Sequence, residues 1–192
     1  MTNGYTRLPS TPGLRLKTRL VLPVSFFNRP AEKVARELVG MFLVRKMGRE
    51  ERAFRITETE AYVGPHDLAC HASKGRTKRT EVMFGSPAHF YVYLCYGMHW
   101  LLNVVVREKG YPAAVLIRGV EGVHGPGRVT KALGITGDLH GKPAIRSSGL
   151  WFEDRGEKRG VVERSARVGV SYAKEWASKE LRFVLRDEVR NE

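Results

Sequence analysis

The sequence has few cysteines, no long apolar run and fewer acidic than basic residues, and each shortage narrows what the protein can be. Its two cysteines, Cys70 and Cys95, are too few for the disulfide framework of a small secreted domain and fit free thiols in a reducing compartment. The apolar stretch 20–27 is short and contains a proline, and no run reaches membrane-spanning length. We therefore expect a soluble intracellular protein.

Several signatures of common enzyme classes are also missing. The chain has no P-loop, no G-x-S-x-G elbow and no dinucleotide fingerprint, which weakens the NTPase, esterase and dehydrogenase interpretations. The stretch "HDLACH" does hold four side chains of metal-binding type, His66, Asp67, Cys70 and His71. Zinc sites usually combine ligand pairs from separate segments, and no second Cys/His cluster exists in the sequence. We expect no metal and no cofactor.

The residues that are abundant are basic. The chain has 192 residues, 42% of them hydrophobic, which suits a single globular domain, placed here at residues 20–192. It carries 33 Lys and Arg against 20 Asp and Glu, a formal net charge of +13, so a polyanion is the expected partner. Residues 1–19 are basic, lack acidic residues and predict a flexible arm, although a nucleic-acid-binding arm or a transit peptide fits the same composition.

Local patterns predict a mixture of strands and short helices. Residues 28–40 form a helix in this interpretation, with Pro30 in its first turn and Gly40 as its stop, and residues 41–47 and 52–63 form a hairpin around the turn "GREE". Further along we expect two strands within 89–106 around a Tyr96-Gly97 turn, a strand at 113–121, a short helix within 125–135, an irregular excursion at 138–158 containing Trp151 and Phe152, and a strand end, a short helix and a closing strand within 167–187.

Two basic segments are candidates for phosphate contacts. The helix that begins near Pro126 would present free N–H groups and a positive dipole end, although an ordinary capped surface helix explains the same sequence. The candidate contacts with a phosphate backbone are Lys74, Arg76, Lys78 and Arg79 in the loop before Met83, and Arg128 and Lys131 in the helix.

Three strands that look buried each carry one polar residue among apolar neighbours: Glu60, Asn103 and Arg118. Burying such groups without partners costs several kcal/mol. We expect them to converge on a polar pocket in which Glu60 and Arg118 compensate each other, although each residue alone is also explained as a strand-edge side chain that reaches solvent.

The stretch "RITETEAYV" places Ile56, Glu58, Glu60 and Tyr62 on one face if the strand is regular, because residues two apart point the same way. Tyr62 would then lie near the pocket, as would Tyr91 and Tyr93, which share a face of another strand. Tyrosines in strands are usually packing residues, but here they also suit stacking on a nucleobase.

Tyr96 stands apart from the other tyrosines because we expect it at a hairpin tip on a basic surface. A large side chain at such a tip is placed to wedge into a duplex and fill the space of a displaced base.

These residues together resemble the alkyladenine (3-methyladenine) DNA glycosylases of the non-helix-hairpin-helix type. The resemblance runs from about residue 26 to 186 and rests on long collinear motifs, which are far more specific than a short pattern. The motifs are "ETEAYVGPHDLACH", "MFGSPAHFYVYLCYGMHWLLNVV", "AAVLIRGVE", "GPGRVTKALGI" and "RVGVSYAKEWASKELRF".

The resemblance implies an α+β fold, a single compact domain with a curved antiparallel sheet and surrounding helices. It also implies a DNA repair enzyme that flips alkylated or deaminated purines into a pocket. By the same resemblance, Glu60 is the general base, Arg118 and the Val168 carbonyl help hold the attacking water, Tyr62, His71 and Tyr93 enclose the flipped base, Tyr96 intercalates, and Asn103 excludes the 2-amino group of guanine. Glu58 receives no role.

The chemistry implied needs only one carboxylate, because an N-alkylated purine is already a good leaving group. No lysine stands beside Glu60 to form a Schiff base, so we expect a monofunctional enzyme that leaves an abasic site. The expected partner is damaged double-stranded DNA, bound by a monomer, in the bacterial cytoplasm at the nucleoid or in a eukaryotic nucleus.

Two other hypotheses remain open at this point. A nucleic-acid-binding module without catalysis would explain the basic surface and the tyrosines, but it gains nothing from a carboxylate that repels phosphates. A metal-dependent hydrolase would use "HDLACH".

Overall fold

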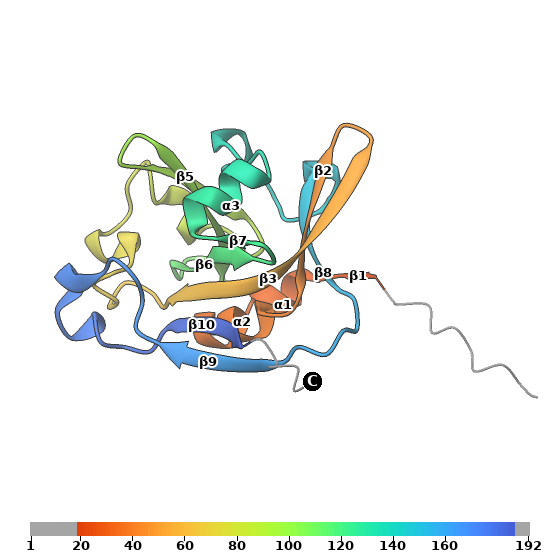
Figure 1. Ribbon diagram of the computed structural model, residues 1–192. Coiled ribbons are helices and arrows are strands. Elements are labelled where there is room, and N and C mark those ends of the chain that lie inside the picture. The colour runs from red at the N-terminus through yellow and green to blue at the C-terminus, as the bar shows by residue number, and fades with distance from the viewer. Residues whose placement is uncertain (1–18, 187–192) are drawn as a thin grey trace, which may run out of the picture.

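The protein is built around one large sheet of antiparallel pairs with short helices on its surfaces (Figure 1). The computed structural model describes residues 19–186. In the described part, neighbouring strands follow the order β1-β8-β2-β3-β6-β5-β4, while β10 pairs with β3 and β9, and β7 pairs with β6. The strands are β1 Leu20–Val21, β2 Phe42–Met47, β3 Glu50–Tyr62, β4 Phe90–Cys95, β5 His99–Val106, β6 Ala113–Val120, β7 Val123–His124, β8 Leu150–Asp154, β9 Val161–Ser165 and β10 Arg182–Arg186.

Strand β3 holds the two halves of the sheet together. Its first half pairs with β2, from Glu50 to Arg55, and its second half pairs with β6 and β10. In Figure 1 the β2–β3 hairpin extends away from the body of the molecule. The predicted α+β fold with a large antiparallel sheet is confirmed, and the sheet is not strongly curled.

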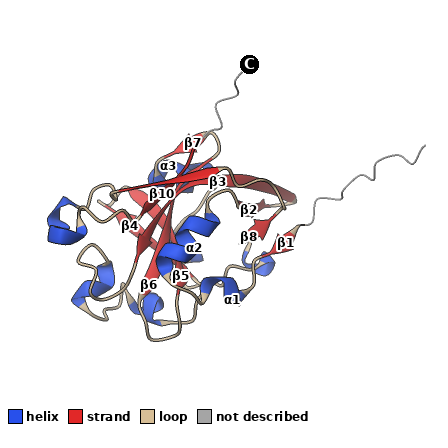
Figure 2. Ribbon diagram, turned by 90° about the horizontal axis from the view of Figure 1, so that it is seen from below, coloured by secondary structure: helices blue, strands red, loops and turns tan. Residues whose placement is uncertain are grey.

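The helices are short. Helix α2, Ala31–Leu38, packs on β3, β6 and β10 and is seen against the strands in Figure 2. Its apolar side is buried, and the chain turns out of it at Gly40, whose φ of 87° favours glycine. A helix is therefore present within the predicted range 28–40, but it is shorter than expected, and Pro30 is its N-cap rather than a residue of its first turn. The other helical elements are α1 Val24–Phe27, α3 Pro126–Ala132 and the 3₁₀ turns His71–Lys74, Glu81–Phe84, Gly137–Leu139, Arg146–Ser148 and Ser171–Trp176.

The main core fills the space between α2 and one face of the sheet. Val34 and Leu38 of α2 lie there with Ala61 of β3 and Ile117 of β6, all fully buried. Burying each such aliphatic side chain stabilises the fold by about 1.5–3 kcal/mol. Because side chains alternate along a strand, the residues next to Ala61 on β3 and next to Ile117 on β6 must point to the opposite face of the sheet.

One expected loop is a strand. Residues 138–158 were predicted to be irregular, but Leu150–Asp154 form β8, which pairs with β1 and β2. Trp151 and Phe152 are buried in it, and the Trp151 indole N–H donates to Glu153 Oε1 at 2.8 Å. The strand has only five residues between polar and glycine-containing segments, so its alternation was too short to recognise.

The face assigned to Ile56 was also wrong. The pairing of β3 with β6 shifts register around Glu58, and Thr57 and Arg118 have no partner in the ladder. This irregularity turns Ile56 into the main core, whereas Glu58 contacts Arg118 on the other face. The predicted alternation therefore holds for Glu58, Glu60 and Tyr62 but not for Ile56.

The remaining predictions of local structure are confirmed in part. The turn between β2 and β3 is Gly48-Arg49, because Glu50 and Glu51 already pair in β3, and β9 ends at Ser165, before the strand end expected from residue 167. The strands at 41–47, 52–63, 89–106 and 113–121 and the helix within 125–135 are present. Among residues 19–186, each helix is too short or too polar to cross a membrane. The predicted arm at 1–19 lies, except for Arg19, outside the described residues.

Candidate active site

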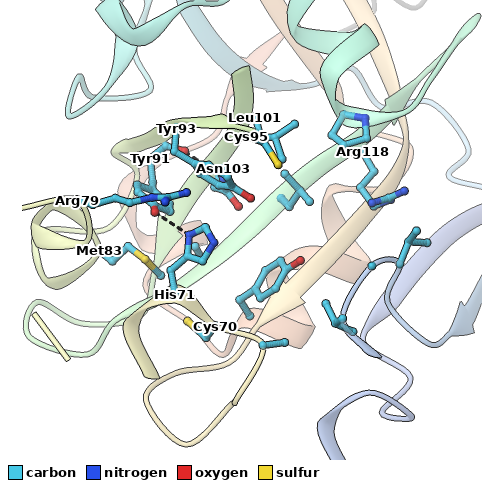
Figure 3. A pocket seen from close by; sticks show the side chains of 18 of the residues that line it. Cys70, His71, Arg79, Met83, Tyr91, Tyr93, Cys95, Leu101, Asn103 and Arg118 are labelled. Atoms are coloured by element: carbon cyan, nitrogen blue, oxygen red, sulfur yellow. Dashed lines mark hydrogen bonds between the residues drawn. The ribbon is translucent and has the colours of Figure 1, made fainter. Parts of the chain in front are cut away.

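A cavity of about 470 Å³ opens on the face of the sheet opposite α2 (Figure 3). Strands β4, β5 and β6 supply its back through Tyr93, Asn103 and Arg118, and the segments around His71 and Val168 supply its sides. The volume lies in the range of pockets that hold small organic groups such as a nucleobase. The predicted convergence of the polar strand residues is thus observed: Asn103 and Arg118 line the cavity, and Glu60 lies directly behind Tyr62, Arg118 and Val168, which contact it.

Glu60 is a fully buried carboxylate with several partners. Its Oε1 accepts the backbone N–H of Val168 at 2.8 Å, and its Oε2 accepts the Tyr62 hydroxyl at 3.0 Å. Arg118 Nε lies 3.5 Å from Oε1. Burial raises the pKa of Glu60, while Arg118, Val168 and Tyr62 oppose that rise by stabilising the charged form.

Glu58 binds Arg118 more closely than Glu60 does. Glu58 Oε1 accepts Arg118 Nε at 2.8 Å and Arg182 Nε at 2.6 Å, so one carboxylate oxygen holds two guanidinium groups. Gly119 makes room for this, because a Cβ there would lie 3.0 Å from the Glu58 Cβ. The sequence predicted compensation between Glu60 and Arg118 alone, and it assigned no role to Glu58.

A buried ion pair that the sequence analysis did not find fixes the segment carrying Val168. Arg167 binds Asp67 through two hydrogen bonds, Nη1 to Oδ2 at 2.6 Å and Nη2 to Oδ1 at 2.8 Å, and both side chains are fully buried. Arg167 also donates to the Ala61 carbonyl at 2.8 Å, next to Glu60. The pair therefore joins the end of β3 to the segment whose N–H reaches Glu60. We call Glu58, Glu60, Asp67, Arg118 and Arg167 the polar floor of the cavity.

Aromatic side chains form one wall. His71 meets the Tyr93 ring edge-on with centroids 4.6 Å apart, and its Nδ1 is hydrogen-bonded to the Tyr91 hydroxyl at 2.8 Å (Figure 3). Burial, and then the positive charges of Arg79 and Lys74, lower the pKa of His71 to about 4, so the imidazole is neutral near pH 7. Tyr62, His71 and Tyr93 therefore lie around the same cavity, as the sequence predicted.

Asn103 is held in one orientation. Its Nδ2 donates to the Tyr91 carbonyl at 3.1 Å, and the side chain is buried at the back of the cavity. A buried amide fixed in this way presents a defined edge to whatever occupies the space.

Several large apolar side chains are exposed around the opening of the cavity, and such a cluster on the surface indicates a binding site. Tyr96 is 90% exposed at the tip of the β4–β5 hairpin and has a φ of 50°, a left-handed conformation that is uncommon outside glycine. Leu94, Val168 and Tyr172 also line the opening and are exposed. We call Leu94, Tyr96, Met98, Val168 and Tyr172 the hydrophobic rim; Met98, on the same hairpin as Tyr96, is 71% exposed.

A family model of methylpurine-DNA glycosylases matches residues 25–189, nearly the whole chain. The chain belongs to the methylpurine-DNA glycosylase family. This membership confirms the resemblance drawn from the motifs and, with it, a DNA glycosylase as the class of enzyme and DNA as the partner. It disfavours a binding module without catalysis.

Relatives from bacteria and archaea are similar to this chain over most of its length and over most of their own. A protein of Myxococcus xanthus is 48% identical over 176 residues, which is 86% of this chain and 90% of the relative. Proteins of Legionella pneumophila and Methanocella arvoryzae are each 44% identical and cover 94% and 91% of the respective relative, and 86% and 85% of this chain. All three carry the name "Putative 3-methyladenine DNA glycosylase".

The candidate phosphate contacts of this glycosylase are distributed unevenly. Arg79 lines the cavity, whereas Arg76 forms an ion pair with Glu81, with Nε 2.7 Å from Oε2. Lys74, Lys78, Arg128 and Lys131 are exposed, and α3 begins beside the opening, where Pro126 lines the cavity.

The "HDLACH" side chains have partners of other kinds. Asp67 binds Arg167, His71 binds Tyr91, and His66 packs against Trp176 with centroids 5.3 Å apart. Burial raises the pKa of the Cys70 thiol to about 11. The thiol is therefore protonated near pH 7 and is not the thiolate that binds zinc. Within residues 19–186, no group of three or more His, Cys, Asp or Glu is arranged to hold a metal ion.

Proposed function

We propose that the protein removes alkylated or deaminated purines, of the 3-methyladenine, hypoxanthine and ethenoadenine class, from duplex DNA by hydrolysing the N-glycosidic bond. The observation that carries this proposal is the buried Glu60 carboxylate, hydrogen-bonded by Val168 and flanked by Arg118, at the back of an aromatic-lined cavity. The names of the relatives support 3-methyladenine as one substrate.

Glu60 acts as general base in the proposed reaction. It takes a proton from a water whose oxygen attacks C1′ of the deoxyribose, and its negative charge stabilises the positive charge that develops on the sugar. Burial raises the pKa of Glu60 and makes it a stronger base, while the charge of Arg118 opposes that rise and favours the ionised form. Tyr62, Arg118 and Val168 cover the carboxylate and line the cavity, so a local shift of one of them admits the water. Arg118 and the Val168 carbonyl then hold that water.

The remaining site residues bind the displaced nucleotide. Tyr62, His71 and Tyr93 enclose the flipped base, and the fixed amide of Asn103 rejects a base with a 2-amino group. Tyr96 inserts into the duplex and occupies the space that the base has left, which its exposure at a hairpin tip allows.

The reaction needs no lysine nucleophile and no cofactor in this proposal. Residues 55–65 around Glu60 contain no lysine, so no Schiff base forms there and the product is an abasic site in an intact strand. The protein works as a monomer wherever the DNA is, which is the nucleoid in a bacterial cytoplasm and the nucleus in a eukaryote. Exposed Lys74, Lys78, Arg128 and Lys131 contact the DNA backbone.

The test is single-turnover release of hypoxanthine and 3-methyladenine from duplex DNA with EDTA present, comparing the wild type with Glu60→Gln. We expect the wild type to release both free bases without strand cleavage. The variant lacks the general base, so its rate of base release should fall by about 10² to 10⁴ while DNA binding persists. Glu163→Gln, which removes a carboxylate that is exposed on β9, is the matched control and should keep wild-type rates. A wild type that binds damaged DNA but releases neither base would refute the proposal.

A further inference from the structure

Arg79 is an exposed cation whose side chain lines the cavity. It lies between the 3₁₀ turns His71–Lys74 and Glu81–Phe84, and its guanidinium carbon is 4.8 Å from the centroid of the Tyr93 ring. Figure 3 shows the side chain reaching toward Tyr91 and the imidazole of His71. Arg76 in the same loop is neutralised by Glu81, so the two arginines have different surroundings.

The positive charge of Arg79 is felt inside the cavity. Second to burial, Arg79 lowers the pKa of His71, and it opposes the effect of burial on the pKa of Tyr91. Both of these side chains line the cavity. A base enclosed by His71 and Tyr93 would therefore lie in a positive potential.

Hydrolysis makes the departing base more negative by one unit of charge. The water oxygen bonds to C1′, the C1′–N bond breaks, its electron pair goes to the purine, and the water proton goes to Glu60. Hypoxanthine starts neutral and leaves as an anion that solvent protonates afterwards. 3-Methyladenine starts as a cation and leaves neutral, so its transition state carries little net charge on the base.

We infer that Arg79 is a specificity-determining residue that stabilises the departing base and favours lesions that are uncharged before excision. This inference rests on the function proposed above. For hypoxanthine, Arg79 meets no charge on binding and attracts the charge that develops in the transition state. For 3-methyladenine, Arg79 repels the bound cation and gains nothing in a nearly neutral transition state, so its net effect relative to free enzyme and DNA is small.

The test compares the two lesions in one kinetic quantity, the single-turnover rate constant divided by the enzyme concentration at half-saturation, kmax/K1/2. The variants are Arg79→Gln, which removes the charge, and Arg79→Lys, which keeps it. Lys78→Gln removes the neighbouring exposed cation and reports the general loss of DNA affinity, which affects both lesions equally. The ratio of kmax/K1/2 for hypoxanthine to kmax/K1/2 for 3-methyladenine cancels that general loss and any partial loss of folded protein.

We expect Arg79→Gln to lower kmax/K1/2 for hypoxanthine about ten- to fiftyfold more than for 3-methyladenine, less than the roughly 10²- to 10³-fold of a buried donor because Arg79 is exposed. Arg79→Lys should restore most of the ratio, and Lys78→Gln should leave the ratio unchanged. An equal fall for both lesions in Arg79→Gln, or the same change of ratio in Lys78→Gln, would overturn the inference. If the wild type released neither base, the proposed function itself would fail, which is a different result from an unchanged ratio.

Discussion

The polar floor and the hydrophobic rim of the same cavity are built by opposite means. In the floor, Glu60, Asp67 and Arg167 are buried and each is hydrogen-bonded to other residues, so their positions depend on the fold. In the rim, Tyr96 and Tyr172 are 90% and 67% exposed and stand free of the core. We infer from this difference that the buried floor serves the chemistry and that the exposed tyrosines of the rim serve contact with DNA. Changes to the floor should lower stability and excision rate together, whereas changes to the rim should lower lesion affinity and excision and leave stability unchanged.

The largest of the expected effects that separate the two layers comes from Asp67→Asn. This change leaves the Arg167 guanidinium buried without its counter-charge and releases the segment that presents Val168 to Glu60. Breaking a buried pair costs about 3–5 kcal/mol of the free energy of unfolding, and base release should fall as well. Urea unfolding and single-turnover excision measure the two losses.

The matched control for that variant is Asp154→Asn. Asp154 pairs with Arg159 at 3.5 Å on the surface, so its loss should cost less than about 1 kcal/mol. If Asp67→Asn were no more destabilising than Asp154→Asn, the polar floor would not be the rigid layer described here.

A smaller and different effect is expected from Tyr96→Ala in the rim. The free energy of unfolding should change by less than about 0.5 kcal/mol, because the side chain is exposed. Affinity for lesion-containing duplex and single-turnover excision should both fall about tenfold, the cost of losing one stacked aromatic group.

Leu20→Ala, at an exposed position on β1, is the control for removing a large apolar side chain and should change neither quantity. Lesion affinity and excision unchanged in Tyr96→Ala would refute the wedge role of Tyr96.

The sequence predicted most of the fold because its boundaries are written in local residue types. Pro30 and Gly40 delimit α2, and the turn of the β2–β3 hairpin is Gly48-Arg49, the first half of the predicted turn "GREE". What it could not predict depends on irregular pairing. The register shift around Glu58 breaks the alternation that placed Ile56, and β8 is too short to show a period.

The site was predictable to the extent that it consists of polar residues in apolar strands. Glu60, Asn103 and Arg118 were identified on that ground and do converge. The pairing of Asp67 with Arg167 was missed because the two residues are 100 positions apart and lie in loops, and Asp67 was considered only as a possible metal ligand. Arg79 was interpreted as a backbone contact, and only the structure shows that it faces Tyr93.

The pH dependence of the wild-type excision rate tests most directly the proposal that the Glu60 carboxylate is the general base. The lesion should be 3-methyladenine, which needs no proton to leave, with saturating enzyme and circular dichroism to verify folding. Because burial raises the pKa of Glu60 above its ordinary value of 4.5, the ionised base is lost as pH falls through that raised pKa. His71, with a pKa of about 4, titrates lower. We predict that the wild-type rate falls as the pH is lowered, with a midpoint above pH 4.5, and that Glu60→Gln shows no such fall. A rate independent of pH down to 4.5, or the same fall in Glu60→Gln, would contradict the account.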